Sequence, residues 1–147
     1  MAGANTAVGT NALADNTTGA YNTAIGWGAG QNITTGRENN CFGAASFEVL
    51  TTGSYNCGMG YQSGYYCESG DYNVALGYRS GFNVTTGTNN IFLGKDAGRS
   101  GSPGGEITTA SHTMVLGDEN ISAAHIQVAL TVASDKRDKT DVKPLDL

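Results

Sequence analysis

The sequence repeats itself with a period of seventeen, and this period constrains the fold more than any other feature. A glycine returns at this interval at Gly9, Gly26, Gly43, Gly60, Gly77 and Gly94. An asparagine stands four residues before each of them, at Asn5, Asn22, Asn39, Asn56, Asn73 and Asn90. A second series keeps the same step and follows a Thr-Thr pair in four of five cases: Gly19, Gly36, Gly53, Gly70 and Gly87. A fixed period indicates that the fold is assembled from stacked copies of one short unit.

A unit of this length with two glycines is too short for a helical hairpin, but it can hold short strands and tight turns. The chain has 22 glycines without a Gly-X-Y triplet, which excludes collagen, and each glycine inside a helix would cost about 1 kcal/mol. Glycine and asparagine both tolerate the left-handed backbone that tight turns require. We therefore predict an all-β fold, a β-solenoid or β-roll of about six to seven coils, stacked at the strand spacing of about 4.8 Å.

The repeat divides the chain into three parts. Residues 3–120 carry the repeats. A degenerate seventh copy lies at Thr113–Gly117, and its glycine follows Gly94 at a distance that exceeds the period by six residues. The six additional residues predict a loop insertion near 99–109. Residues 121–133 alternate between apolar and polar side chains, which predicts one closing β-strand. Residues 134–147 form a charged C-terminal segment.

One position of the repeat is always large and apolar, which predicts that it is buried. This column, directly before the repeated glycine, consists of Val8, Ile25, Phe42, Met59, Leu76, Leu93 and Leu116. The preceding position is small in the first five copies and, by strand alternation, faces the opposite way. Both faces of the strand are thus expected to be covered, one of them by other copies of the chain. We predict a homotrimer in which the large column lies at the trimer interface or in the core.

Charge and composition exclude several classes of function. The formal charge of −5 provides no basic surface for nucleic acid, and no long apolar run predicts membrane insertion. Cys41, Cys57 and Cys67 form no CxxC pair and are expected to be buried thiols, without a disulfide framework or a metal site. The run Gly26–Gly30 belongs to the repeat, so no nucleotide or other cofactor is expected. Met1–Asn5 lacks the features of a signal peptide, so synthesis in a cytoplasm is expected.

Aromatic residues recur at fixed repeat positions and are the candidates for receptor binding. Tyr21, Tyr55 and Tyr72 lie five residues before the repeated glycine, and Trp27, Tyr61 and Tyr78 lie one residue after it. Tyr65 and Tyr66, with Phe82, lie in the variable part of their coils. Exposed rings suit the apolar faces of sugars, which predicts contact with a glycan. The alternative is that such ladders only stabilise the stacked sheet.

The repeats resemble those of two related groups of fibrous proteins. Asn5–Gly9, Asn22–Gly26 and Asn73–Gly77 share the form Asn-x-φ-φ-Gly, where φ is apolar, and resemble the head repeats of trimeric autotransporter adhesins. Those heads are left-handed trimeric β-rolls. Similar repeats occur in tail-fibre and tailspike proteins of tailed phages. The resemblance covers residues 3–120 and implies a homotrimeric fibre.

The C-terminal segment resembles a phage-specific element. Residues 134–145 match the form Ser-Asp-x-Arg-x-Lys-x-x-φ-x-Pro-Leu that opens the intramolecular chaperone domain of many phage fibres. In that family the domain trimerises the fibre and is released by autoproteolysis at the serine, aided by the lysine five residues later. The resemblance places these two residues at Ser134 and Lys139. Since the residues that build the chaperone do not follow Leu147, we expect no autoprotease and no enzymatic activity in this chain.

These observations predict a structural component of a phage tail fibre, made in the host cytoplasm and located in the virion. Its expected partners are two further copies of itself, other tail proteins, and a glycan or protein on the host cell surface. One alternative is the head domain of a bacterial trimeric autotransporter adhesin, which leaves the Ser134 motif unexplained. The other is a self-cleaving fibre that uses Ser134 and Lys139.

Overall fold

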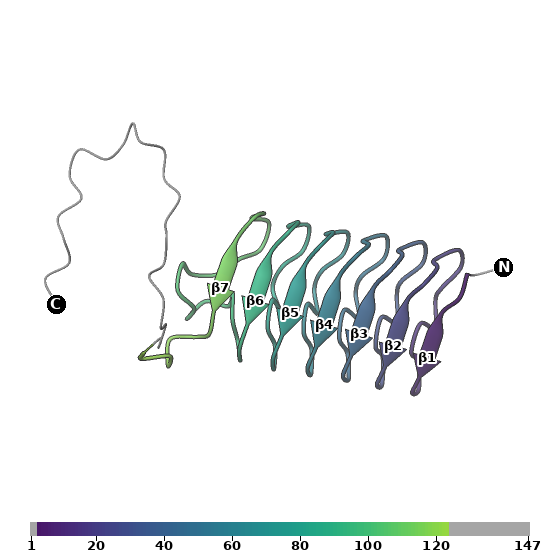
Figure 1. Ribbon diagram of the computed structural model, residues 1–147, viewed down its shortest axis with the longest axis horizontal. Coiled ribbons are helices and arrows are strands. Elements are labelled where there is room, and N and C mark those ends of the chain that lie inside the picture. Colours follow the sequence, from purple (N-terminus) through teal and green to yellow (C-terminus); the bar gives the residue numbers. More distant parts are fainter. Residues whose placement is uncertain (1–2, 124–147) are drawn as a thin grey trace, which may run out of the picture.

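A computed structural model describes residues 3–123, and these form a parallel β-solenoid without a helix (Figure 1). The strands have three residues each: β1 (Thr6–Val8), β2 (Thr23–Ile25), β3 (Asn40–Phe42), β4 (Cys57–Met59), β5 (Val74–Leu76), β6 (Ile91–Leu93) and β7 (Met114–Leu116). They pair in chain order within one sheet. The predicted all-β solenoid is therefore confirmed. Most of the predicted closing strand and the whole segment 134–147, with Ser134 and Lys139, lie outside the described residues.

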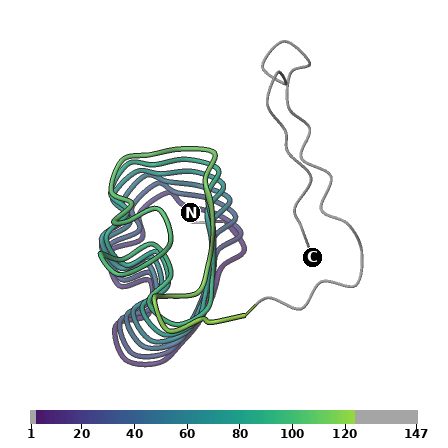
Figure 2. The same cartoon turned by 90° about the vertical axis from the view of Figure 1, so that its left-hand side faces the viewer.

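The strand register equals the sequence period. Thr6 of β1 pairs with Thr23 of β2, and each later strand up to β6 is paired one period further along. Ile91 of β6 pairs with Met114 of β7, a longer step that contains the insertion. Seen along the axis, the coils follow nearly the same path, one behind another (Figure 2). Side chains at equivalent positions of the repeat therefore form columns along the solenoid.

Two consecutive tight turns follow the repeated glycine in the coils of β1 to β6. In the coil of β2, the N–H of Ala29 donates to the carbonyl of Gly26 over 3.3 Å, and that of Gln31 donates to Gly28 over 3.3 Å. The third residue of each turn, Gly28 or Gly30, has a left-handed φ of 63° or 55°. This is the conformation of a type II turn, which explains the need for residues that accept a positive φ.

The repeated asparagines form a hydrogen-bonded ladder through the coils. The Asn56 Oδ1 atom accepts the backbone N–H of Asn73 over 2.9 Å, and its Nδ2 atom donates to the carbonyl of Gly70 over 2.8 Å. Nδ2 also contacts Oδ1 of Asn39 at 3.1 Å. Equivalent contacts recur between neighbouring coils. The asparagines from Asn22 onwards are buried, so these side chains satisfy backbone groups that water cannot reach.

The core of each coil is lined by the small column of the strand. Ala24, Cys41 and Ala75 are fully buried, whereas Val8 and Met59 of the large column are each 56% exposed. The prediction that the large column is buried is therefore wrong within a single chain. The interior of so short a coil is too narrow for a large side chain in every rung, so the alternating strand directs the large residues outwards. Whether other chains cover them stays a prediction.

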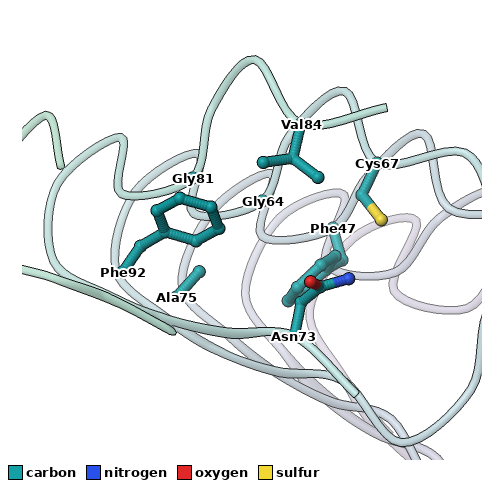
Figure 3. Close-up of a pocket in the computed structure, with 8 residues that line it drawn as sticks. All are labelled: Phe47, Gly64, Cys67, Asn73, Ala75, Gly81, Val84 and Phe92. Atoms are coloured by element: carbon teal, nitrogen blue, oxygen red, sulfur yellow. The ribbon is translucent and has the colours of Figure 1, made fainter. Parts of the chain in front are cut away.

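Two phenylalanines enter this narrow core where glycines provide the space. Phe47 and Phe92 are each 1% exposed. A Cβ atom on Gly64 would collide with the Phe47 ring, and one on Gly98 would lie 2.6 Å from the Phe92 ring. Figure 3 shows the apolar interior between the two rings, lined also by Ala75, Gly81 and Val84, which has no room for a water molecule. Large residues in one coil are thus compensated by glycine in the same or the next coil.

The thiols and the insertion complete the fold. Cys41 and Cys67 are buried as predicted, and Cys57 is half-buried on the outer side of β4. The insertion between β6 and β7 is closed by a hydrogen bond of 2.9 Å from the N–H of Ile107 to the carbonyl of Gly98. Ile107 packs in the core with Val84, Phe92 and Val115.

Candidate functional site

The first aromatic column predicted from the sequence is exposed along one side of the solenoid. We call it the tyrosine column; it consists of Tyr21, Glu38, Tyr55, Tyr72, Asn89 and His112, five residues before each repeated glycine. Tyr21 is 63% exposed and Tyr72 54%. The rings of Tyr55 and Tyr72 stack with their centroids 4.9 Å apart and their planes inclined by 2°. The structure therefore shows the ladder that the sequence period predicts.

Every residue of the tyrosine column has a left-handed backbone. Its φ angles lie between 55° at Glu38 and 62° at Tyr55. From Glu38 onwards each residue donates its N–H to a carbonyl of the preceding coil, as Tyr55 does to Arg37 over 2.9 Å, and this bond fixes the local backbone. Asparagine accepts this conformation readily, whereas a bulky residue in it costs about 1–2 kcal/mol. Tyrosine disfavours a left-handed backbone, so its backbone preference does not explain why it occurs in this column.

A surface depression lies within the tyrosine column. Tyr21, Glu38, Asn40 and Tyr55 line it, and it has a volume of about 580 Å³. Asn40 comes from the neighbouring outward-facing position of β3, so two adjacent columns build the depression. Glu38 and Asn40 are both exposed, and neither side chain is hydrogen-bonded to any described residue. The depression therefore combines two aromatic rings with two polar groups that are free to bind a ligand.

The second aromatic column follows the repeated glycines. It consists of Trp27, Ala44, Tyr61, Tyr78 and Lys95, and we call it the post-glycine column. Trp27 is 55% exposed, and the rings of Tyr61 and Tyr78 stack at 5.6 Å. The Arg79 guanidinium lies 5.3 Å from the centre of the Tyr78 ring and donates through Nε to Gln62 over 2.9 Å. This column presents aromatic surface too, and one of its rings is engaged by a cation.

Tyr65, Tyr66 and Phe82 form a packed aromatic cluster. Tyr65 stacks on Phe82 at 5.4 Å, and Tyr66 meets Phe82 edge-on at 5.0 Å. The guanidinium groups of Arg79 and Arg99 each lie 5.2 Å from the centre of the Phe82 ring. Burial, with a smaller contribution from Glu48, raises the pKa of the Tyr65 hydroxyl. The contacts among these rings fit the stabilising role, while Tyr66 keeps 46% of its surface exposed, about as much as Tyr55.

The outer sheet face is an exposed surface with many apolar side chains beside the tyrosine column. We define it by the large column, Val8 to Leu116, and the other outward position of the strands: Thr6, Thr23, Asn40, Cys57, Val74, Ile91 and Met114. The large column includes Leu116, which is 52% exposed, and in the other position Met114 is 62% exposed. A parallel sheet normally has both faces covered. In a single chain this face has solvent on it.

An ion-pair network holds the last coil. Lys95 Nζ lies 3.1 Å from Asp96 Oδ2 and 3.2 Å from Asp118 Oδ2. Asn120 donates to Asp118 from its backbone N–H over 3.0 Å and from its side chain over 3.1 Å. These hydrogen bonds, led by the backbone donor and supported by Lys95, hold the pKa of the Asp118 carboxyl below its usual range. The network fixes the turn after β7 and shows no arrangement for catalysis.

Metal ligation and membrane crossing find no support in the described part of the chain. No three His, Cys, Asp or Glu side chains within residues 3–123 come together as a metal site requires. None of these residues lies in a helix that is long and apolar enough to cross a bilayer. Family models, curated protein sequences and solved structures were compared with the chain, and none of them matches. The geometry of the columns is therefore the basis for a proposed function.

The structure sorts the candidate residues into three groups. Tyr21, Tyr55 and Tyr72 share the tyrosine column, Trp27, Tyr61 and Tyr78 share the post-glycine column, and Tyr65 and Tyr66 belong to the packed cluster. Sequence reasoning missed Glu38 and Asn40. Glu38 could have been found, because it stands one period from both Tyr21 and Tyr55. No such signal existed for Asn40, because the first position of the strand, which Asn40 occupies in β3, is threonine or an apolar residue in the other coils.

Proposed function

We propose that this chain is a structural segment of a phage tail fibre that assembles with copies of itself and attaches to a glycan on the host cell surface. It acts by binding and not by catalysis. The observation that carries the proposal is the placement of an uncovered apolar sheet face beside columns of exposed aromatic rings. The first surface supports self-assembly, and the second supports attachment.

The outer sheet face supports assembly because of its composition and shape. Met59, Leu93 and Leu116 lie in one straight column with at least about a third of each side chain exposed. Burying a fully exposed side chain of this size contributes about 1.5–3 kcal/mol. A rotation axis parallel to the solenoid brings the same columns of each chain together in every coil. A threefold axis fits this geometry and the fibre-like repeats, so we propose a homotrimer.

The aromatic columns support attachment because repetition multiplies weak contacts. A single sugar bound on one or two rings is held weakly, whereas three chains that carry the same columns bind one polysaccharide at several places. The formal charge of −5 favours neutral or cationic glycans over acidic ones. Other tail proteins are the proposed partners at the ends of the segment, and the virion is the proposed location.

The assembly part is tested by replacing Leu76, a half-buried residue of the outer sheet face, with aspartate. We expect three chains by light scattering for the unmodified protein and dissociation for Leu76→Asp, because three unpaired carboxylates would be buried, at several kcal/mol each. Thr86→Asp places the same charge on an exposed bend and serves as the control. A monomeric unmodified protein, or an unchanged trimer of Leu76→Asp, would contradict the proposed assembly.

A further inference from the structure

The tyrosine column has a gap of one ring. Tyr55 and Tyr72 show that rings in adjacent coils fill the column, with centroids 4.9 Å apart. Tyr21 and Tyr55 are separated by the coil of Glu38, where no ring is present, and both line the depression. At a strand spacing of about 4.8 Å, two coils place equivalent positions roughly 9.6 Å apart. The gap is therefore about as wide as one further ring requires, with one strand spacing on each side.

We infer that this gap is a binding subsite for one pyranose ring, neutral or amino-bearing, of a polysaccharide. This assignment rests on the proposed function and names its ligand class. A pyranose presents apolar C–H groups on its two faces, which suit contact with Tyr21 on one side and Tyr55 on the other. Ring distances near about 5 Å lie within the range in which stacked rings attract each other.

The polar groups of the depression select the chemistry of the ligand. The Glu38 carboxylate and the Asn40 amide line the depression together with the two rings, and neither is hydrogen-bonded to another described side chain. A carboxylate accepts hydrogen bonds from hydroxyl groups and pairs with an ammonium group. It also repels a second carboxylate, so sugars that carry one, such as uronic acids, are excluded.

The post-glycine column provides an internal comparison. Trp27 and Tyr61 are likewise separated by a coil without a ring, that of Ala44. Alanine offers no polar group to orient a sugar or to distinguish one sugar from another. Oriented binding of a sugar needs a few well-placed polar groups in addition to apolar surface. The combination of two rings and two polar groups therefore favours the gap at Glu38.

The backbone of the column supports a test in which the gap is filled. Glu38 has a φ of 55°, and Tyr21, Tyr55 and Tyr72 have φ angles of 60°, 62° and 58°. A tyrosine at position 38 is thus compatible with the fold and would complete the ladder. Glu38→Tyr should weaken sugar binding strongly while it preserves folding. Asn89→Tyr makes a change of the same kind two coils away from the depression, where φ is 57°, and is the matched control.

The experiment measures binding of the full chain to immobilised oligosaccharides of glucose, galactose, glucosamine and glucuronic acid, and to host cells. We expect binding to neutral or amino sugars and none to glucuronic acid. Glu38→Tyr, Tyr21→Ala and Tyr55→Ala should each weaken it by about tenfold or more, while Asn89→Tyr stays within about twofold. Glu38→Gln should reduce binding to glucosamine more than binding to glucose. Circular dichroism and light scattering confirm that each variant is folded and assembled as before.

The outcomes separate this inference from the proposed function. If the protein attaches to cells but Glu38→Tyr attaches equally well, the subsite is wrong and the attachment function stands. Preference for glucuronic acid, or attachment that is lost when cell-surface proteins are digested, also overturns the subsite. A protein that binds neither cells nor any of the four sugars overturns both.

Discussion

Replacing Asn56 with alanine tests how the ladder of buried asparagines stabilises the solenoid. Asn56 is 1% exposed, its Oδ1 atom accepts the N–H of Asn73, and its Nδ2 atom donates to the carbonyl of Gly70. Asn56→Ala leaves the N–H of Asn73 buried without a partner and the carbonyl of Gly70 with only the weak contact from the Cys67 thiol at 3.8 Å. A fully unpaired group costs about 1–3 kcal/mol and the carbonyl adds a smaller loss, so the free energy of unfolding should fall by about 2–5 kcal/mol.

The matched control is the same substitution at the end of the ladder. Asn5 makes the equivalent bonds, to the carbonyl of Gly19 over 2.9 Å and from the N–H of Asn22 over 2.8 Å, but it is only half-buried. Water can replace a half-buried side chain, so Asn5→Ala should cost less than Asn56→Ala by about 1 kcal/mol or more. Urea unfolding at equal chain concentration measures both changes, since assembly makes stability depend on concentration.

Hydrogen exchange locates the effect within the chain. Asn56→Ala should expose the amide of Asn73 to exchange in the folded protein and leave the coil of β2 unchanged, because each coil contacts mainly its neighbours. The reasoning fails if the two variants lose equal stability. It fails also if Asn56→Ala destabilises the protein but the amide of Asn73 stays protected, because the loss would then come from packing.

Two further predictions concern titration and reactivity. The hydrogen bonds from Asn120 hold the Asp118 pKa low, so their stabilisation is present above the ordinary carboxyl pKa and is lost as the pH falls through the folded value. Exchange in the last coil should accordingly rise below about pH 4, and in Asp118→Asn it should be high at all pH values. Burial raises the pKa of Cys67 to about 12, whereas Cys57 is half-buried on the outer sheet face. A thiol reagent should modify Cys67 only after unfolding, and labelling of Cys67 in the folded protein would contradict its burial.

The sequence determined the register of this fold but not the direction in which its columns face. The repeat period predicted the pairing of Thr6 with Thr23 and of each later pair up to β6. Alternation shows only that Ala24 and Ile25 lie on opposite sides of the strand. Which side is the interior depends on the space inside a coil, a property of the closed coil that no local pattern contains. For this reason the larger residue does not lie in the core of a single chain, and its burial by other chains stays a prediction.

The repeat period predicts which residues of the candidate site share a column, but it does not predict which residues of neighbouring columns lie close to them. The period alone placed Tyr21 and Tyr55 in one column, and in the structure both line one depression, which the sequence did not predict. The expected glycan contact indicates aromatic residues and therefore does not single out Glu38, which stands one period from both Tyr21 and Tyr55. Asn40 lies in the adjacent column, and its proximity depends on how far the chain turns between positions 38 and 40. That angle is set by the left-handed φ of Glu38, which the sequence does not reveal.

Departures from the repeat carry more information than the repeat itself. A column with the same side chain in every coil requires no adjustment of the residues around it. Phe92 departs from its column, and its ring is accommodated only because positions 81 and 98 are glycine. That departure is compensated inside the core and therefore serves packing. Glu38 interrupts a column of exposed tyrosines, and no described side chain pairs with it, so nothing within the described coils compensates for the missing ring. At an exposed position, a ligand would supply the contact that the repeat lacks. Glu38 differs in this respect from Phe92, because the residues around Phe92 in the core already accommodate its departure from the repeat.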